Sequence, residues 1–179
     1  MALTATIFTF DIDLADSDRD VYESLALRVA RHPSETAEYL VTRVLAYALE
    51  LTEGIEFTRG LFEPDQPAIA IRDLTGAMRS WIDIGAPEAQ RLHRASKAVP
   101  RVVVYSHRDP AHLVGRLAGE RIHRADALEV YAIDRGLIGA LVGRLERRVT
   151  WSLAVQAREL YLTTGGDTLT GSVSRHPVA

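Results

Sequence analysis

The sequence contains no cysteine, and it contains a single lysine, Lys97, among 21 basic residues. The lack of thiols excludes disulfide scaffolds, thiolate zinc sites, iron–sulfur clusters and cysteine nucleophiles. Long apolar runs are missing as well, since none approaches the roughly 20 residues that span a bilayer. The start of the sequence also lacks the basic segment that precedes a cleavable apolar leader. We therefore expect a soluble, cytoplasmic protein without a membrane or disulfide partner.

Charge is distributed unevenly along the 179 residues. Residues 1–90 carry 16 acidic side chains and seven arginines, whereas residues 91–179 carry eight acidic and 14 basic side chains. This polarity is compatible with an acidic, metal-binding region beside a basic region that binds a polyanion, although such a charge pattern is more commonly just solvated surface. A chain of this length buries roughly 70% of its unfolded surface, so the composition predicts one compact globular domain.

Apolar periodicity predicts a mixture of strands and helices. Alternation over residues 8–14 and 21–29 indicates an antiparallel hairpin, and a stripe at helical spacing over 37–51 indicates a helix that starts near Pro33. Residues 68–72 and 77–84 indicate a second hairpin. The remaining predicted elements are a helix over 87–98, a strand buried on both faces over 102–105, a helix near 109–119, a strand near 128–133, a helix near 134–143 and two or three C-terminal strands. This order predicts a single α/β (α+β) domain over residues 1–179, with a mixed sheet and antiparallel strands at both ends.

Two aspartates are singled out by the second hairpin. Asp65 precedes its first strand and Asp83 lies at the end of its second strand, and the outer ends of an antiparallel hairpin meet. Neighbouring carboxylates stay ionised when a cation lies between them, and Mg²⁺ prefers such oxygen ligands. A metal held there would activate a water and neutralise charge on a phosphodiester. The alternatives are that Asp83 accepts hydrogen bonds from the start of the next helix and that Asp65 is an ordinary loop acid.

The predicted helices on either side of this hairpin supply further candidates. On the helix over 87–98, Gln90, Arg94 and Lys97 project together from the polar side. A cation at that place would stabilise negative charge on a phosphate. On the preceding helix, Glu35 and Glu38 are each placed to complete the carboxylate group, although favourable placement near the positive helix end also explains them.

Four blocks of sequence, taken in order, resemble the YaeQ family of bacterial proteins. The blocks are Met1-Ala2-Leu3 with Ala5-Thr6-Ile7, Ala30-Arg31-His32-Pro33-Ser34-Glu35-Thr36, Phe57-Thr58-Arg59-Gly60-Leu61 and Trp81-Ile82-Asp83-Ile84-Gly85-Ala86-Pro87. The resemblance covers essentially the whole chain. It implies a compact fold built on a variation of the PD-(D/E)XK nuclease core.

The resemblance also implies roles for individual residues. Asp65, after a proline, resembles the first half of the nuclease motif, and Asp83 resembles the second half, in which Gly85 stands at the place of the lysine. With Glu35, or Glu38 in its place, these aspartates would hold Mg²⁺ or Mn²⁺. Lys97 or Arg94 would substitute for the missing lysine, and Gln90 would position water or phosphate. Four more residues are predicted to contact phosphates of a nucleic acid, namely Arg31, His32, Arg59 and Arg91.

Two functions follow from this interpretation. The leading hypothesis is a Mg²⁺- or Mn²⁺-dependent, nuclease-like protein that acts on or binds nucleic acid. The alternative is a non-catalytic nucleic-acid-binding or regulatory protein on a degenerate nuclease fold. Gly85 favours the alternative, whereas the retained carboxylates favour the enzyme.

Overall fold

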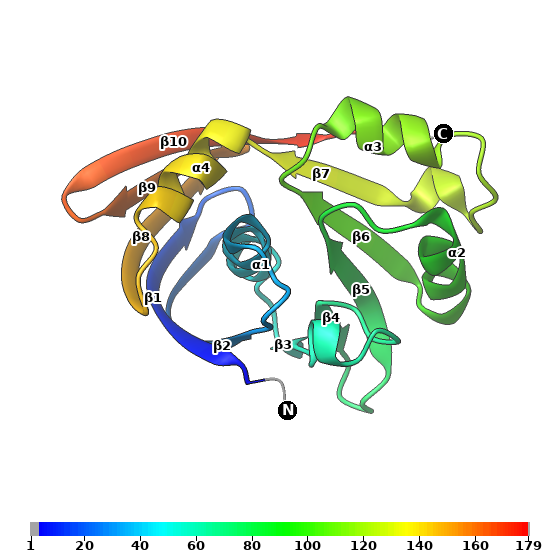
Figure 1. Ribbon diagram of the computed structural model, residues 1–179, viewed down its shortest axis with the longest axis horizontal. Helices are drawn as coiled ribbons and strands as arrows, with labels where there is room; N and C mark the ends of the chain where they lie inside the picture. The colour runs from blue at the N-terminus through cyan, green and yellow to red at the C-terminus, as the bar shows by residue number, and fades with distance from the viewer. Residues whose placement is uncertain (1–3, 179) are drawn as a thin grey trace. The chain divides into compact units, whose positions relative to one another are not determined.

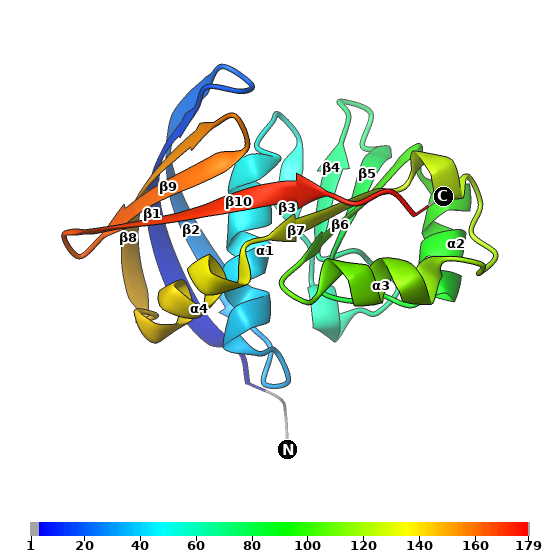
Figure 2. The same cartoon turned by 90° about the horizontal axis from the view of Figure 1, so that it is seen from above.

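The computed structural model describes residues 4–178, and the chain divides into two compact units. The first unit comprises residues 4–41 and 133–173, and the second comprises residues 42–132 and 174–178. Along the chain, helix α1 (Ala37–Leu49) begins in the first unit and ends in the second. Figures 1 and 2 show the elements of both units, which are described in turn.

The first unit is built on strands that lie in the order β2-β1-β8-β9-β10, with both parallel and antiparallel pairs. Its strands are β1 (Thr6–Asp16), β2 (Val21–Arg31), β8 (Arg148–Gln156), β9 (Glu159–Thr164) and β10 (Asp167–Arg175). Strands β1 and β2 form an antiparallel hairpin, and β8, β9 and β10 form an antiparallel meander (Figure 2). The two pieces join because β1 pairs with β8 in parallel.

The core of the first unit follows from strand alternation. Every second side chain of β1 from Phe8 to Leu14 is buried, and Phe10 meets Trp151 of β8 edge-to-face at 5.1 Å. Helix α4 (Arg135–Gly143) packs so closely on β10 that a Cβ added at Gly171 would lie 2.8 Å from the Cβ of Leu137. Asp134 caps this helix by accepting a hydrogen bond from the Leu137 N–H at 3.0 Å.

A single carboxylate links two turns of the first unit. Ala157 and Arg158, between β8 and β9, both have positive φ, at 51° and 61°. Their backbone N–H groups donate to the carboxylate of Asp18 at 2.7 and 2.9 Å, and Asp18 belongs to the turn between β1 and β2. These bonds lower the pKa of Asp18, because they favour its ionised form. Asp18 therefore helps to hold a turn that two L-residues rarely adopt.

The second unit is built on strands that lie in the order β7-β6-β5-β4-β3, again with both parallel and antiparallel pairs. Its strands are β3 (Ile55–Phe57), β4 (Ile69–Arg72), β5 (Met78–Ile84), β6 (Arg101–Ser106) and β7 (Glu129–Ile133). Strands β3, β4 and β5 are antiparallel, whereas β5, β6 and β7 are parallel. The connections carry helices α2 (Ala89–Ala98) and α3 (Pro110–Leu117) and the 3₁₀ turns η1 (Gly60–Phe62) and η2 (Ala125–Ala127).

Helices α2 and α3 cover one face of the parallel strands (Figure 1). Leu92 of α2 and Leu113 of α3 are almost completely buried, in one cluster with Val104 and Val130. On the opposite face of these strands, Tyr105 of β6 stacks on Tyr131 of β7. The Tyr105 hydroxyl donates a hydrogen bond to the Glu50 carboxylate at 2.7 Å. The strands are therefore buried on both faces, as expected for β5, β6 and β7 in a parallel arrangement.

The structure confirms the predicted α+β class with mixed sheets, and the two predicted hairpins are present. The assignment of one domain over the whole chain stays a prediction. The predicted start of the first helix is wrong, since α1 begins at Ala37 and Pro33 lies in a turn before it. Glu35 consequently precedes the helix, and β3 was not predicted. Among residues 4–178 no helix is long and apolar enough to cross a membrane.

Candidate functional site

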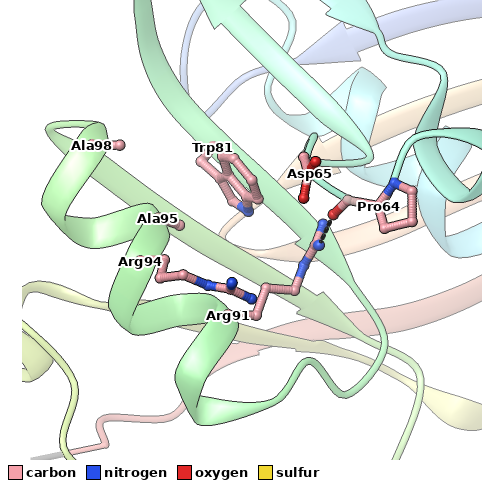
Figure 3. A pocket seen from close by; sticks show the side chains of 7 residues that line it. All are labelled: Pro64, Asp65, Trp81, Arg91, Arg94, Ala95 and Ala98. Atoms are coloured by element: carbon pink, nitrogen blue, oxygen red, sulfur yellow. Dashed lines mark hydrogen bonds between the residues drawn. The ribbon is translucent and has the colours of Figure 1, made fainter.

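One arginine joins the two ends of the β4–β5 hairpin. Ile69 pairs with Ile82 across the hairpin, so the segment before β4 and the end of β5 lie at the same end. From α2, the Arg91 guanidinium donates to both carboxylate oxygens of Asp83, at 2.8 and 3.0 Å. It also donates to the carbonyl oxygen of Gln66 at 2.7 Å and to that of Pro64 (Figure 3). The predicted convergence of the hairpin ends is therefore observed, and a guanidinium bridges them.

The pair of Asp83 and Arg91 is largely withdrawn from water. The side chain of Asp83 is 5% exposed and that of Arg91 is 29% exposed. The guanidinium carbon of Arg91 also lies 5.1 Å from the ring centre of Trp81, within the range of a cation–π contact. A bidentate guanidinium satisfies both oxygens of a carboxylate and neutralises its charge. Asp83 is thus held by the protein itself.

The local sequence explains how Arg91 reaches Asp83. Strand β5 ends at Ile84, and Gly85 turns the chain with a φ of 90° while its N–H donates to the Tyr105 carbonyl at 2.9 Å. Glycine adopts this conformation without steric cost. Helix α2 starts four residues later and buries Leu92 in the core, so the neighbouring Arg91 lies in the first turn, beside the end of β5.

A pocket of about 210 Å³ opens beside this ion pair. Figure 3 shows the residues that line it, which are Pro64, Asp65, Trp81, Arg91, Arg94, Ala95 and Ala98. Asp65 and Arg94 are exposed, and neither side chain makes a hydrogen bond or an ion pair with the described part of the chain. The indole Nε1 of Trp81 is buried, and it too lacks a hydrogen-bond partner among residues 4–178. The pocket therefore contains one anionic and one cationic side chain, Asp65 and Arg94, that do not pair with each other, next to Arg91, which is paired with Asp83.

A second feature of α2 is the docking of loop 121–124 against it. The His123 N–H donates to Nδ1 of His93 at 3.0 Å, and the Ser96 hydroxyl donates to the His123 carbonyl at 2.5 Å. The Arg124 guanidinium donates to the Ser96 and Val99 carbonyls at 3.0 and 3.3 Å. Four hydrogen bonds thus fix the loop on the helix.

This docking gathers positive charge around His93. Partial desolvation is the largest cause that lowers the pKa of His93, and the nearby charges of Lys97, Arg121 and His123 lower it further. Lys97, Arg121 and His123 are all exposed, as is Arg94 one residue after His93. We call Arg94, Lys97, Arg121 and His123 the basic face.

The predicted glutamate ligands belong to the first unit, whereas both aspartates belong to the second. Glu35 is buried before α1, and its Oε1 accepts a hydrogen bond from the His32 N–H at 3.4 Å. Arg31 donates from Nε to the Glu35 carbonyl at 2.9 Å. Glu38 is exposed in the first turn of α1. Within the first unit, Arg31, His32 and Glu35 therefore form one local hydrogen-bonded group.

The side chains of the pocket do not fit a divalent cation as they are arranged. Both oxygens of Asp83 accept hydrogen bonds from Arg91, so this carboxylate has a cationic partner already. Within either unit of the described chain, no three carboxylate or histidine side chains gather into a ligand set. We therefore derive no chemical step through a metal at this site.

Other predicted residues have plain surroundings. Gln90 is exposed on α2, and the Arg59 side chain is 74% exposed and pairs with Glu63 at 3.1 Å. The sequence reasoning missed that Arg91 binds Asp83 and that loop 121–124 belongs to the same surface as α2. The pairing of Arg91 with Asp83 has a sequence signal, which is an acid at a strand end followed eight residues later by an arginine in the first turn of a helix. The docking of loop 121–124 on α2 has no such signal, because the residues that contact each other are 25 to 30 positions apart in the sequence.

The fold and the pocket define an α+β protein with mixed sheets and a small, mostly apolar pocket with charged side chains between a strand hairpin and the following helix. A family model described as YaeQ protein matches residues 1–173. The chain belongs to the YaeQ family, as its sequence blocks predicted.

Similar proteins support this assignment. The chain is 29% identical over 170 residues to a Salmonella typhi protein described as "Uncharacterized protein YaeQ", with 94% of each chain covered. It is 28% identical over 164 residues to the protein of the same description from Escherichia coli K12, with 91% of each covered.

Two crystal structures have the same fold. The YaeQ protein from Pseudomonas syringae matches with a TM-score of 0.86 and 27% identity, over 96% of this chain and 95% of that one. The YaeQ protein from Xanthomonas axonopodis pv. citri matches with a TM-score of 0.82 and 29% identity, over 98% of this chain and 100% of that one.

Proposed function

We propose that this protein binds nucleic acid, and that the phosphates contact the basic face. The observation that carries the proposal is the docking of loop 121–124 on α2, which fixes Arg121 and His123 beside His93 and Lys97. Phosphate contacts supply most of the non-specific affinity for nucleic acids and require cations held in register with the backbone. A docked loop provides such a register without a cost in ordering the protein on binding.

The local charge supports the same proposal. Residues 91–124 carry eight lysines and arginines but only two acidic residues, although the whole chain has a net charge of −3. Arg94 and Lys97 form no ion pair with any residue of the described chain. They therefore bind a phosphate without first breaking an internal interaction.

The basic face sets the expected salt dependence. Each neutralised phosphate contributes about −0.7 to the logarithmic salt slope for a single strand and about −0.9 for duplex DNA. Three or four contacts on the basic face then weaken binding roughly 20- to 150-fold between about 50 and 200 mM salt.

Fluorescence anisotropy of a labelled oligonucleotide tests the proposal. We expect salt-dependent binding to the wild-type protein and a loss of binding in Arg94→Glu/Lys97→Glu. The matched control is Arg79→Glu/Arg148→Glu, which makes the same change in net charge at arginines that are 62% and 77% exposed elsewhere. Equal loss in the two double variants would show that net charge alone drives binding, and absence of binding at about 50 mM salt would refute the proposal.

A second candidate function is metal-dependent phosphodiester hydrolysis. The observation that favours it is the convergence of the Pro64–Gln66 segment with Asp83, which brings a loop beside a buried carboxylate. Metal binding there requires Arg91 to leave Asp83. Calorimetric titration of Mn²⁺ into Arg91→Gln and Asp83→Asn/Arg91→Gln, with a nicking assay on both, tests it. Binding confined to the first variant supports a carboxylate site, whereas a folded Arg91→Gln protein that binds no Mn²⁺ rules it out.

A further inference from the structure

The pocket beside α2 has a chemistry of its own, which the phosphate contacts of the basic face do not use. We infer that it holds one unpaired nucleobase with an exocyclic amino group, with Asp65 as the acceptor of that group and Arg94 on the adjoining phosphate. The inference rests on the proposed binding of nucleic acid and names the kind of nucleic acid, a single strand.

The first argument is the unsatisfied charge in the pocket. Asp65 and Arg94 line the same pocket, yet within residues 4–178 the Asp65 carboxylate forms no ion pair. Opposite charges that share a small pocket without touching leave room for a ligand that carries a donor and an anion. A nucleotide has this pair of groups, because a cytosine or adenine amino group donates and the phosphate is anionic.

The second argument is the shape and lining of the pocket. The apolar side chains of Pro64, Ala95 and Ala98 also line the pocket, and the Trp81 ring lies between α2 and the Pro64–Asp65 segment in the view of Figure 3. Small flat walls of this kind suit the face of a heterocyclic ring. The pocket volume is only about 210 Å³, so we expect it to take one base rather than a base pair.

The third argument is that Arg91 is engaged elsewhere. Its guanidinium binds Asp83 and two carbonyl oxygens and lies over Trp81, so it belongs to the wall of the pocket. Arg94 is therefore the cation that meets the ligand. Its place on α2, three residues before Lys97, continues the pocket into the basic face. A strand whose phosphates follow the basic face thus passes the mouth of the pocket.

The chemistry of Asp65 predicts a base preference. Its carboxylate accepts hydrogen bonds but donates none, so it favours the amino group of cytosine and opposes the carbonyl oxygen that thymine presents at the same position. Hydrogen bonds to a charged group contribute about 1.5 to 3 kcal/mol, so a tenfold preference for cytosine over thymine is a conservative expectation. Duplex ends and paired bases do not enter the pocket.

Anisotropy with oligodeoxycytidylate, oligothymidylate and a blunt duplex of equal length tests the inference. We expect the wild-type protein to bind the cytosine strand about tenfold more tightly than the thymine strand, and the duplex more weakly than either. Asp65→Asn should remove the preference and leave the salt slope unchanged. Glu88→Gln, which removes an exposed acidic residue just before α2, is the matched control and should keep the preference.

The outcomes separate this inference from the proposed function. Salt-dependent binding without any preference between cytosine and thymine would overturn the base pocket and leave the basic face standing. A preference that survives Asp65→Asn would overturn the role of Asp65. No binding to any strand would refute the proposed function itself. Thermal unfolding of each variant verifies the fold, and Asp65→Ala repeats the test if Asp65→Asn is unfolded.

Discussion

Replacing Arg91 with alanine gives the sharpest test of the site. Asp83 is 5% exposed at its side chain, and it would lose the donors to both carboxylate oxygens. Breaking a buried ion pair by removing one partner costs about 3 to 5 kcal/mol. Because the side chain of Arg91 is 29% exposed, water reaches part of the vacated space, and we expect a loss of about 3 kcal/mol in the free energy of unfolding. For a chain of this length, that lowers the melting temperature by roughly 6 to 12 °C.

The double-mutant cycle isolates the pair. Asp83→Ala should cost less than Arg91→Ala, about 1 to 2 kcal/mol, because Arg91 keeps the Pro64 and Gln66 carbonyls as acceptors. The variant that lacks both side chains should lose at least about 1 kcal/mol less free energy of unfolding than the sum of the two single losses. Urea unfolding followed by tryptophan fluorescence and circular dichroism measures all four proteins. A loss below about 1 kcal/mol for Arg91→Ala, or strict additivity in the cycle, would refute the reasoning.

Three further predictions concern stability. Gly54→Ala should lower the free energy of unfolding by at least about 2 kcal/mol in urea, because φ is 88° and the new Cβ would overlap the carbonyl oxygen of Arg72 in β4. Gly76→Ala is the comparison, since φ is 86° there but the space is open, and it should cost about 1 kcal/mol. Asp18 stabilises the fold fully above its ordinary pKa of 3.8, and because its folded pKa is lower, this contribution is lost as the pH falls through that lower value. Asp18→Ala should therefore lower the melting temperature at neutral pH and flatten its acid dependence, and an unchanged acid limb would contradict this. Burial is the largest cause that raises the pKa of Tyr105 well above 10.0, and the charge of Glu50 is the next. The stabilisation by Tyr105 is therefore complete below pH 10.0 and is lost as the pH rises toward the pKa of the folded state. Tyr105→Phe should reduce this alkaline loss in thermal unfolding, and an alkaline profile identical to that of the wild type would refute the assignment.

The sequence was most informative where structure is local. The β4–β5 hairpin is closed by the short turn at residues 73–76, so alternation and turn residues sufficed to place Asp83 beside the segment that contains Asp65. The start of α1 was placed too early because Pro33 and the following acids also suit a turn, and Glu35 bonds to the His32 N–H there.

The partners of the site residues depend on packing between distant segments. Arg91 faces Asp83 because Leu92 is buried under α2, and that orientation is set by contacts with α3 and β6 that no local pattern reveals. In the same way, loop 121–124 joins the basic face through hydrogen bonds to α2 that its own composition does not predict. Spacing placed the segment of Asp65 beside the end of β5, and tertiary packing decided that Arg91 is the partner of Asp83.

The parallel pairing of β1 with β8 bears on the order in which the chain folds. Arg148 at the start of β8 contacts Asp11 of β1 across 137 residues of sequence. At about 5 to 20 residues per second, a ribosome needs roughly 7 to 27 s to synthesise that interval. Until β8 has been synthesised, the edge of β1 that pairs with β8 has no partner, and an unpaired strand edge is a template for pairing with other chains. Because β1 and β8 are so far apart in the sequence, we expect their pairing to be one of the slow steps of folding.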